Sequence, residues 1–204
     1  VAMCLGQMEV ELQRANEIDL QRVSLLARLG SGSACRSVYP VMAVWGKHAE
    51  WQGSSNEYAV CIQDEVHEVF HHFHDDILIV SDKEKSVSST AGHGLMDGNP
   101  YAESRYEQAN KHMSMLKPIL RSGDVESFGE LAELEALTLH ALMMSSSPSY
   151  ILMQPNTIEV IHKIRAFRAE SKIPVYFTLD AGPNVHILYP SSVKDQAQQF
   201  IREE

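Results

Sequence analysis

Two glycine-containing segments carry side chains that could bind and act on an acidic small molecule. Residues 30–37 read GSGSACRS, and residues 178–184 read TLDAGPN. In the first segment, small residues let backbone amides converge on an anion, and Arg36 supplies a planar guanidinium that grips a carboxylate or phosphate through two hydrogen bonds. The alternative is a serine-rich turn at a helix end, with Arg36 in water. Cys35, among small neutral residues, is expected to be a packed thiol.

Asp180 is the second candidate, because it directly follows an apolar run at residues 176–179 and precedes the Gly182-Pro183 pair. The run is typical of a strand, and ligands in open sheets gather at the carboxyl ends of strands. A carboxylate held there can accept a proton from a substrate hydroxyl or orient that hydroxyl. The alternative is a turn residue that bonds its own backbone, which is common for Asp before Gly.

A serine-rich segment supplies further donors. Residues 86–92 read SVSSTAG and follow Lys83 and Lys85, so that they could wrap a phosphate. They belong to a longer stretch, residues 86–100, that is rich in serine and glycine and is expected to be a loop. Loops of that length are usually functional or mobile.

Residues 67–71 read HEVFH and match the H-E-x-x-H zinc motif. On an α-helix His67 and His71 would share a face and could bind zinc, with Glu68 as general base. The segment lies between short strand-like runs that leave no room for a long active-site helix. We therefore expect a solvated histidine-rich loop, and we expect no metal ligands in this chain.

Hydrophobic spacing predicts the elements that must position these residues. Helices are expected over residues 1–15, 20–29, 102–120 and 125–143, from a capping box at 156–159 to before 174, and from 192 onward. Strands are expected over residues 41–45, 58–62, 76–81, 175–179 and 185–188, the last two joined by the turn after Asp180. Interleaved helices and strands indicate an α+β or α/β fold in two lobes, with a boundary near residues 81–86.

The amino-acid composition limits the kinds of partner and environment that suit this chain. A chain of 204 residues with 44% hydrophobic and 22% charged residues can bury one substantial core or two smaller ones. A formal net charge of −10 without a Lys/Arg cluster argues against nucleic acid, and no apolar run reaches the length of a membrane span. Three widely spaced cysteines fit a reducing compartment, the cytoplasm, better than a disulfide framework.

Four motifs taken together resemble the mevalonate diphosphate decarboxylases, which belong with galactokinase, homoserine kinase and mevalonate kinase. The motifs are GSGSACRS at 30–37, VSST at 87–90, LHA at 139–141 and FTLDAGPN at 177–184. They occur in the family's order, and the resemblance covers essentially the whole chain. It implies an α+β, two-lobed small-molecule-kinase (GHMP-type) fold. Residues 1–81 would be the remainder of the N-terminal lobe, and residues 82–204 a complete α/β-sandwich C-terminal lobe.

The resemblance also implies an activity. Enzymes of this family use ATP and Mg²⁺ to phosphorylate the tertiary hydroxyl of mevalonate 5-diphosphate, and loss of phosphate and CO₂ then yields isopentenyl diphosphate. By this likeness Asp180 would deprotonate or orient the hydroxyl, and Arg36 would hold the substrate carboxylate. The substrate-binding residues would be Gly32, Ser33, Arg36, Ser88 and Ser89, with Ser33 and Ser89 on phosphate groups. Homodimers are common in the family.

Two departures from the family pattern are visible. The glycine- and serine-rich ATP loop and a substrate-facing lysine lie upstream of the matched region, and neither is present in this sequence. The ATP-binding residues are therefore expected before Val1, and these 204 residues alone are expected not to turn over substrate. Residues 45–48 and 67–74 also differ from the best-known members and could mark a bacterial branch.

Other functions stay open at this point. The chain could belong to a decarboxylase of another phosphorylated mevalonate, or to a kinase that stops at the 3-phosphate. It could also be a non-catalytic paralogue that serves as a binding or dimerisation module. A stoichiometric zinc would support the metalloprotein alternative at residues 67–71.

Overall fold

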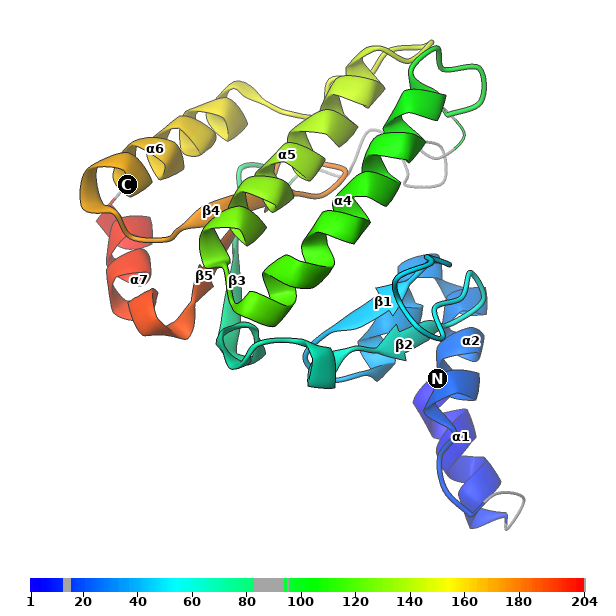
Figure 1. Ribbon diagram of the computed structural model, residues 1–204. Helices are drawn as coiled ribbons and strands as arrows, with labels where there is room; N and C mark the ends of the chain where they lie inside the picture. The colour runs from blue at the N-terminus through cyan, green and yellow to red at the C-terminus, as the bar shows by residue number, and fades with distance from the viewer. Residues whose placement is uncertain (13–15, 83–93, 95, 204) are drawn as a thin grey trace. The chain divides into compact units, whose positions relative to one another are not determined.

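The computed structural model describes all residues except 13–15, 83–93, 95 and 204, and it forms two compact units (Figure 1). The first unit is Val1–His71 and the second is His72–Glu204. The division therefore falls ten residues before the predicted end of the first lobe at residue 81. The reason is strand pairing: Phe73–Leu78 hydrogen-bonds to a strand of the C-terminal unit, which draws the segment after His71 into that unit.

The first unit is a small helical layer with a two-stranded sheet. Its helices are α1 (Ala2–Glu11) and α2 (Leu20–Gly30), its strands are β1 (Ala43–Trp45) and β2 (Ala59–Cys61), and its 3₁₀ helices are η1 (Gly32–Val38), η2 (Gln63–Glu65) and η3 (Glu68–His72). The strands are antiparallel, with Val44 opposite Val60. Asp19 begins α2 by accepting a hydrogen bond from the Arg22 amide, 3.1 Å, as an N-cap residue does.

The second unit packs helices on an antiparallel sheet of order β3-β5-β4. Its elements are β3 (Phe73–Leu78), α4 (Ala102–Ser122), α5 (Val125–Met144), α6 (Pro155–Ser171), β4 (Tyr176–Leu179), β5 (Val185–Pro190), η4 (Ser191–Val193) and α7 (Lys194–Glu203). Helices α4 and α5 run side by side, and α5 also packs along β4 (Figure 1). The predicted helices at 102–120 and 125–143 and the predicted strand pair at 175–179 and 185–188 are confirmed.

One hydrophobic core holds the second unit together. Alternating strand residues point into it, including Phe177, Ile187 and Tyr189, each with no exposed surface. Helix α6 adds Ile161 and Ile164 to the same cluster. The burial of these side chains fixes β4 against β5, and β4 is the strand that leads to Asp180.

The start of α6 differs from the sequence prediction. The capping box forms between Gln154 and Thr157, with Pro155 in the first turn, and does not form between Asn156 and Glu159. Proline explains the shift, because its fixed φ and missing amide suit the first helical position. The shift places the Thr157 hydroxyl at the helix N-terminus, where it has a second partner described below.

No helix among the described residues is both long and apolar enough to cross a membrane.

Candidate functional site

The segment that carries Arg36 is anchored by one buried serine. Ser24, fully buried on α2, donates a hydrogen bond to the Cys35 carbonyl, 2.8 Å, and accepts one from the Ala59 amide, 2.9 Å. One hydroxyl therefore ties η1 to both α2 and β2. Cys35 has no exposed surface, and burial raises the pKa of its thiol. The prediction of a packed thiol at Cys35 is confirmed, because a protonated, inaccessible sulfur is not a nucleophile.

Gly32 lets η1 begin close to an indole ring. A Cβ at Gly32 would lie 3.3 Å from the Trp45 ring, and the Trp45 Nε1–H in turn donates to the Asn56 carbonyl, 3.0 Å. The predicted cradle of free amides is reduced, because the Ala34 amide already donates to the Ser31 carbonyl, 3.0 Å. The segment thus offers side chains to a ligand more than it offers backbone.

Arg36 and Ser33 are both exposed, whereas Cys35 of the same η1 is buried. Within the described residues, the Arg36 guanidinium has neither a hydrogen-bond nor an ion-pair partner. An arginine in that state can bind a carboxylate without first breaking an internal ion pair. The cation that the sequence singled out is therefore available to an anionic ligand.

Asp180 lies at the carboxyl end of β4, as predicted, and it is exposed. Its main-chain carbonyl accepts two hydrogen bonds, one from the Gly182 amide, 2.8 Å, and one from the His140 Nε2–H, 3.1 Å. The first bond closes the tight turn after the strand. The second comes from α5, so that a side chain forty residues away in sequence holds the backbone of the candidate catalytic residue.

The rest of the turn is held just as firmly. The Thr157 hydroxyl donates to the Pro183 carbonyl, 2.6 Å. The Asn184 Oδ1 accepts from the amides of Val80, 2.9 Å, and Ser81, 3.1 Å, in the segment that follows β3. The turn is therefore fastened by α5 at one end and by α6 and the β3 segment at the other.

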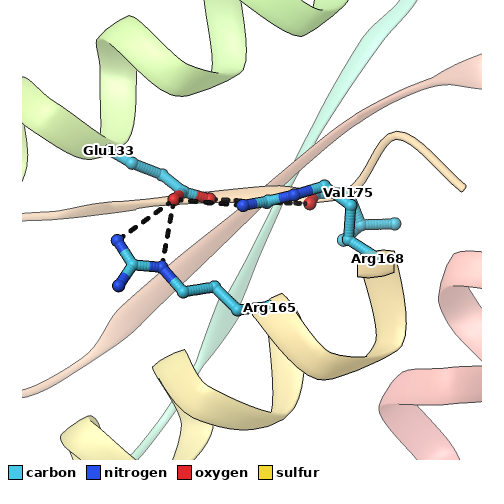
Figure 2. A network of polar contacts seen from close by, with 4 residues as sticks. All are labelled: Glu133, Arg165, Arg168 and Val175. Carbon is cyan, nitrogen blue, oxygen red and sulfur yellow. Dashed lines mark hydrogen bonds and ion pairs between the residues drawn. The ribbon is translucent and has the colours of Figure 1, made fainter. Parts of the chain in front are cut away.

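An ion-pair network around one buried carboxylate fixes β4 against α5 and α6 (Figure 2). Glu133 on α5, with a side chain only 6% exposed, accepts from Arg168 Nη1, 2.6 Å, and from Arg165 Nε, 3.4 Å. The same Arg168 Nη1 also donates to the Val175 carbonyl, 2.7 Å, one residue before β4. A buried carboxylate needs such pairing, because its desolvation is otherwise very unfavourable. The network places the start of β4 relative to both helices.

The histidine motif at residues 67–71 does not form an α-helix. His67 precedes the short 3₁₀ helix η3, and its Nδ1 accepts from the Val69 amide, 3.2 Å. His71 Nε2–H donates to the Val66 carbonyl, 3.2 Å. Among the described residues, no three His, Cys, Asp or Glu side chains gather closely enough to hold a metal ion.

Family models match both parts of the chain. The model described as mevalonate 5-diphosphate decarboxylase C-terminal domain matches residues 76–203, which is more than half of the chain. The model described as diphosphomevalonate decarboxylase-like N-terminal domain matches residues 3–58. The chain belongs to the mevalonate diphosphate decarboxylase family. The resemblance stated from the four motifs is therefore confirmed.

Curated relatives of this family are similar over most of the chain. A phosphomevalonate decarboxylase of Haloferax volcanii is 28% identical over 193 residues, covering 93% of this chain and 56% of that protein. A diphosphomevalonate decarboxylase of Debaryomyces hansenii is 29% identical over 176 residues, covering 84% of this chain and 44% of that protein. The chain thus spans about half the length of the curated relatives it matches.

Solved structures of the family share the fold. The mevalonate diphosphate decarboxylase from Legionella pneumophila is 27% identical with a TM-score of 0.82, covering all of this chain and 60% of that one. The structure of MDDEF in complex with MVAPP, AMPPCP and magnesium is 26% identical with a TM-score of 0.75, covering 91% and 55%. The predicted α+β, GHMP-type fold is confirmed.

Within this family member the predicted site residues fall in three places. Gly32, Ser33 and Arg36 belong to the first unit, and Asp180 belongs to the second. Ser88 and Ser89 lie outside the described residues. Sequence reasoning assigns no role to His140, although this residue contacts the backbone of Asp180. The signal that could have found it was its place in the LHA motif at 139–141, one of the four that carried the resemblance.

Proposed function

We propose that this chain contributes the acid–base carboxylate and the carboxylate-binding arginine of an ATP-dependent mevalonate 5-diphosphate decarboxylase. The observation that carries the proposal is Asp180: an exposed carboxylate on a turn fastened by three elements, in a chain of the mevalonate diphosphate decarboxylase family. A rigid, exposed carboxylate is suited to receive a proton from a bound hydroxyl.

The proposed reaction has two steps. In the first, Asp180 accepts the proton of the tertiary hydroxyl of mevalonate 5-diphosphate, and the hydroxyl oxygen attacks the γ-phosphorus of ATP, with ADP leaving. In the second, the bond between the tertiary carbon and the phosphate oxygen breaks and phosphate leaves with the electron pair. The bond to the carboxylate carbon then breaks, its electrons form the new double bond, and CO₂ leaves. The products are isopentenyl diphosphate, phosphate, ADP and CO₂.

Arg36 suits the second step. Its exposed guanidinium would hold the substrate carboxylate through two hydrogen bonds and orient the bond that breaks. Ser33, exposed three residues earlier, would donate to a phosphate oxygen. Gly32 lets η1 start against the Trp45 indole.

ATP is proposed as the phosphoryl donor and Mg²⁺ as its counterion, supported by the relative solved with AMPPCP and magnesium. The described residues contain no cluster of three metal-ligating side chains, so no magnesium ligand is assigned to them. Phosphoryl transfer depends mainly on positioning and charge, and those are the contributions proposed here for Asp180 and Arg36.

The test uses the complete gene product that contains these 204 residues. It measures ADP and CO₂ formed from ATP and mevalonate 5-diphosphate by the wild type and by Asp180→Asn. We expect kcat to fall by roughly 10²- to 10⁴-fold, the range for loss of a general base. Asp195→Asn, which alters an exposed carboxylate of α7, is the matched control and should keep the wild-type kcat. Absence of ATP-dependent CO₂ release by the wild type, or full activity of Asp180→Asn, would reject the proposal.

A second candidate is a decarboxylase of mevalonate 5-phosphate, favoured by the similarity to the phosphomevalonate decarboxylase of Haloferax volcanii. Comparing kcat/KM for the monophosphate and the diphosphate in the same assay decides between the two substrates. ADP formed without CO₂ would indicate a kinase that stops at the 3-phosphate. The family resemblance also supports a homodimer, which sedimentation of the gene product measures.

A further inference from the structure

We propose that His140 is a positioning residue for Asp180: by holding the main-chain carbonyl of Asp180, its Nε2–H sets the direction of the catalytic carboxylate. This inference rests on the proposed function of Asp180. His140 itself touches no reacting atom. It acts only through its hydrogen bond to the Asp180 backbone.

The bond can be formed only by one tautomer of His140. A carbonyl oxygen accepts, so Nε2 must carry a proton, and in the neutral ring Nδ1 then carries none. The ring is 1% exposed, and burial lowers the pKa of His140. The imidazole is therefore neutral at neutral pH, and it orients the Asp180 backbone without bringing a positive charge that would disfavour proton uptake by the carboxylate.

Two contacts along α5 show how this helix positions the carboxyl end of β4. Near its start, Gly129 packs against the ring of Tyr176 on β4; near its end, His140 reaches Asp180. Eleven residues of α-helix rise roughly 16 Å. Four residues of strand rise roughly 13 Å. The two spans nearly match, so α5 follows β4 in the same direction and contacts it at both ends.

The bond from His140 differs from the other bonds at this turn because it reaches the Asp180 backbone from a separate helix. The Gly182 amide closes the turn on the Asp180 carbonyl from within, and such a bond moves with the turn. The far side of the turn is held at Pro183, whose carbonyl accepts from Thr157, and at Asn184, whose side chain accepts from Val80. At the near side of the turn, His140 of α5 donates a hydrogen bond to the Asp180 carbonyl. Its loss would let the strand end pivot about the fastened far side.

The experiment again uses the complete gene product. His140→Phe keeps an aromatic ring but removes the donor, whereas His140→Gln keeps an N–H that can reach the same carbonyl. We expect His140→Phe to lower kcat by on the order of 10²-fold, the effect of a misplacement of about 1 Å, with KM for mevalonate 5-diphosphate changed less than about threefold. His140→Gln should recover most of the lost kcat. Should His140→Phe not fold, the smaller His140→Leu takes its place.

A matched control separates positioning from general destabilisation. His112→Gln alters another histidine of the same unit, which lies on α4, is 9% exposed and pairs with Glu135. It should lower the melting temperature and leave kcat unchanged. An active wild type whose folded His140→Phe variant retains its kcat would overturn the role of His140 and leave the proposed function standing. A rise in KM with unchanged kcat would also overturn it. An inactive wild type would instead overturn the proposed function itself.

Discussion

Gly129 occupies a helix position where alanine would ordinarily be the more stable residue. Replacing it by alanine has two opposite effects on stability, a gain in helix propensity and a clash with a neighbouring ring. Within an α-helix, Gly→Ala stabilises by about 1 kcal/mol. Here, however, a Cβ at Gly129 would fall less than 3.0 Å from three atoms of the Tyr176 ring, closer than side-chain atoms ever pack. The sign of the change depends on whether that ring can move.

The surroundings of Tyr176 leave it little freedom. The Tyr176 residue is 3% exposed, and the Arg168 guanidinium stacks over the ring, 4.5 Å from the ring centre. Arg168 is in turn held by Glu133 and by the Val175 carbonyl. Moving the ring would combine overpacking strain of about 1–3 kcal/mol with partial loss of the cation–π contact and of Tyr176 burial, about 1–2 kcal/mol each.

The unfavourable contributions exceed the helix gain. We expect Gly129→Ala to lower the free energy of unfolding by about 2–6 kcal/mol, which corresponds to a fall in melting temperature of roughly 4–24 °C for a chain of this size. Denaturant unfolding followed by circular dichroism measures the change. In a Tyr176→Leu background, where the ring is gone, the same Gly129→Ala substitution should cost nothing or stabilise.

Gly30→Ala serves as the matched control, because Gly30 ends α2 and a Cβ there would meet no atom within 4 Å. It should be neutral or stabilising by up to about 1 kcal/mol. A neutral or stabilising Gly129→Ala in the wild-type background would refute the reasoning, since the α5–β4 spacing would then not be fixed by this contact.

Two further predictions concern the same unit. Glu133→Gln should destabilise by about 2–3 kcal/mol, because it removes the buried charge that pairs with the partly buried Arg168. Glu159→Gln, which breaks an exposed pair with Lys163, should change stability by less than about 0.5 kcal/mol, and denaturant midpoints compare the two variants. Burial, reinforced by the hydrogen bond to Asp76, raises the pKa of Tyr189 to about 12. The unfolded chain therefore loses the tyrosine proton first, so stability present below about pH 10 should fall as the pH rises toward 12, and Tyr189→Phe should lose less over that window.

Much of the architecture was predictable because it rests on local patterns. Helical spacing predicted α4 and α5, and two apolar runs joined by the turn after Asp180 predicted the β4–β5 hairpin that presents Asp180. The residues of the four motifs, in their order along the chain, were enough to identify the family. The buried state of Cys35 also followed from its small neutral neighbours.

Long-range contacts decided the rest. The sequence did not show that β3 pairs with β5, which draws residues 72–81 into the second unit, because strand pairing depends on contacts over a hundred residues apart. Nor did local patterns show that Pro155 begins α6 and so frees Thr157 to hold the turn at Pro183. The role of His140 belongs to the same class. A lone histidine on a helix has no local partner, and only the packing of α5 along β4 brings its ring to the carbonyl of Asp180. Sequence thus determined which residues could do the chemistry, and tertiary structure decided what holds Asp180 in place.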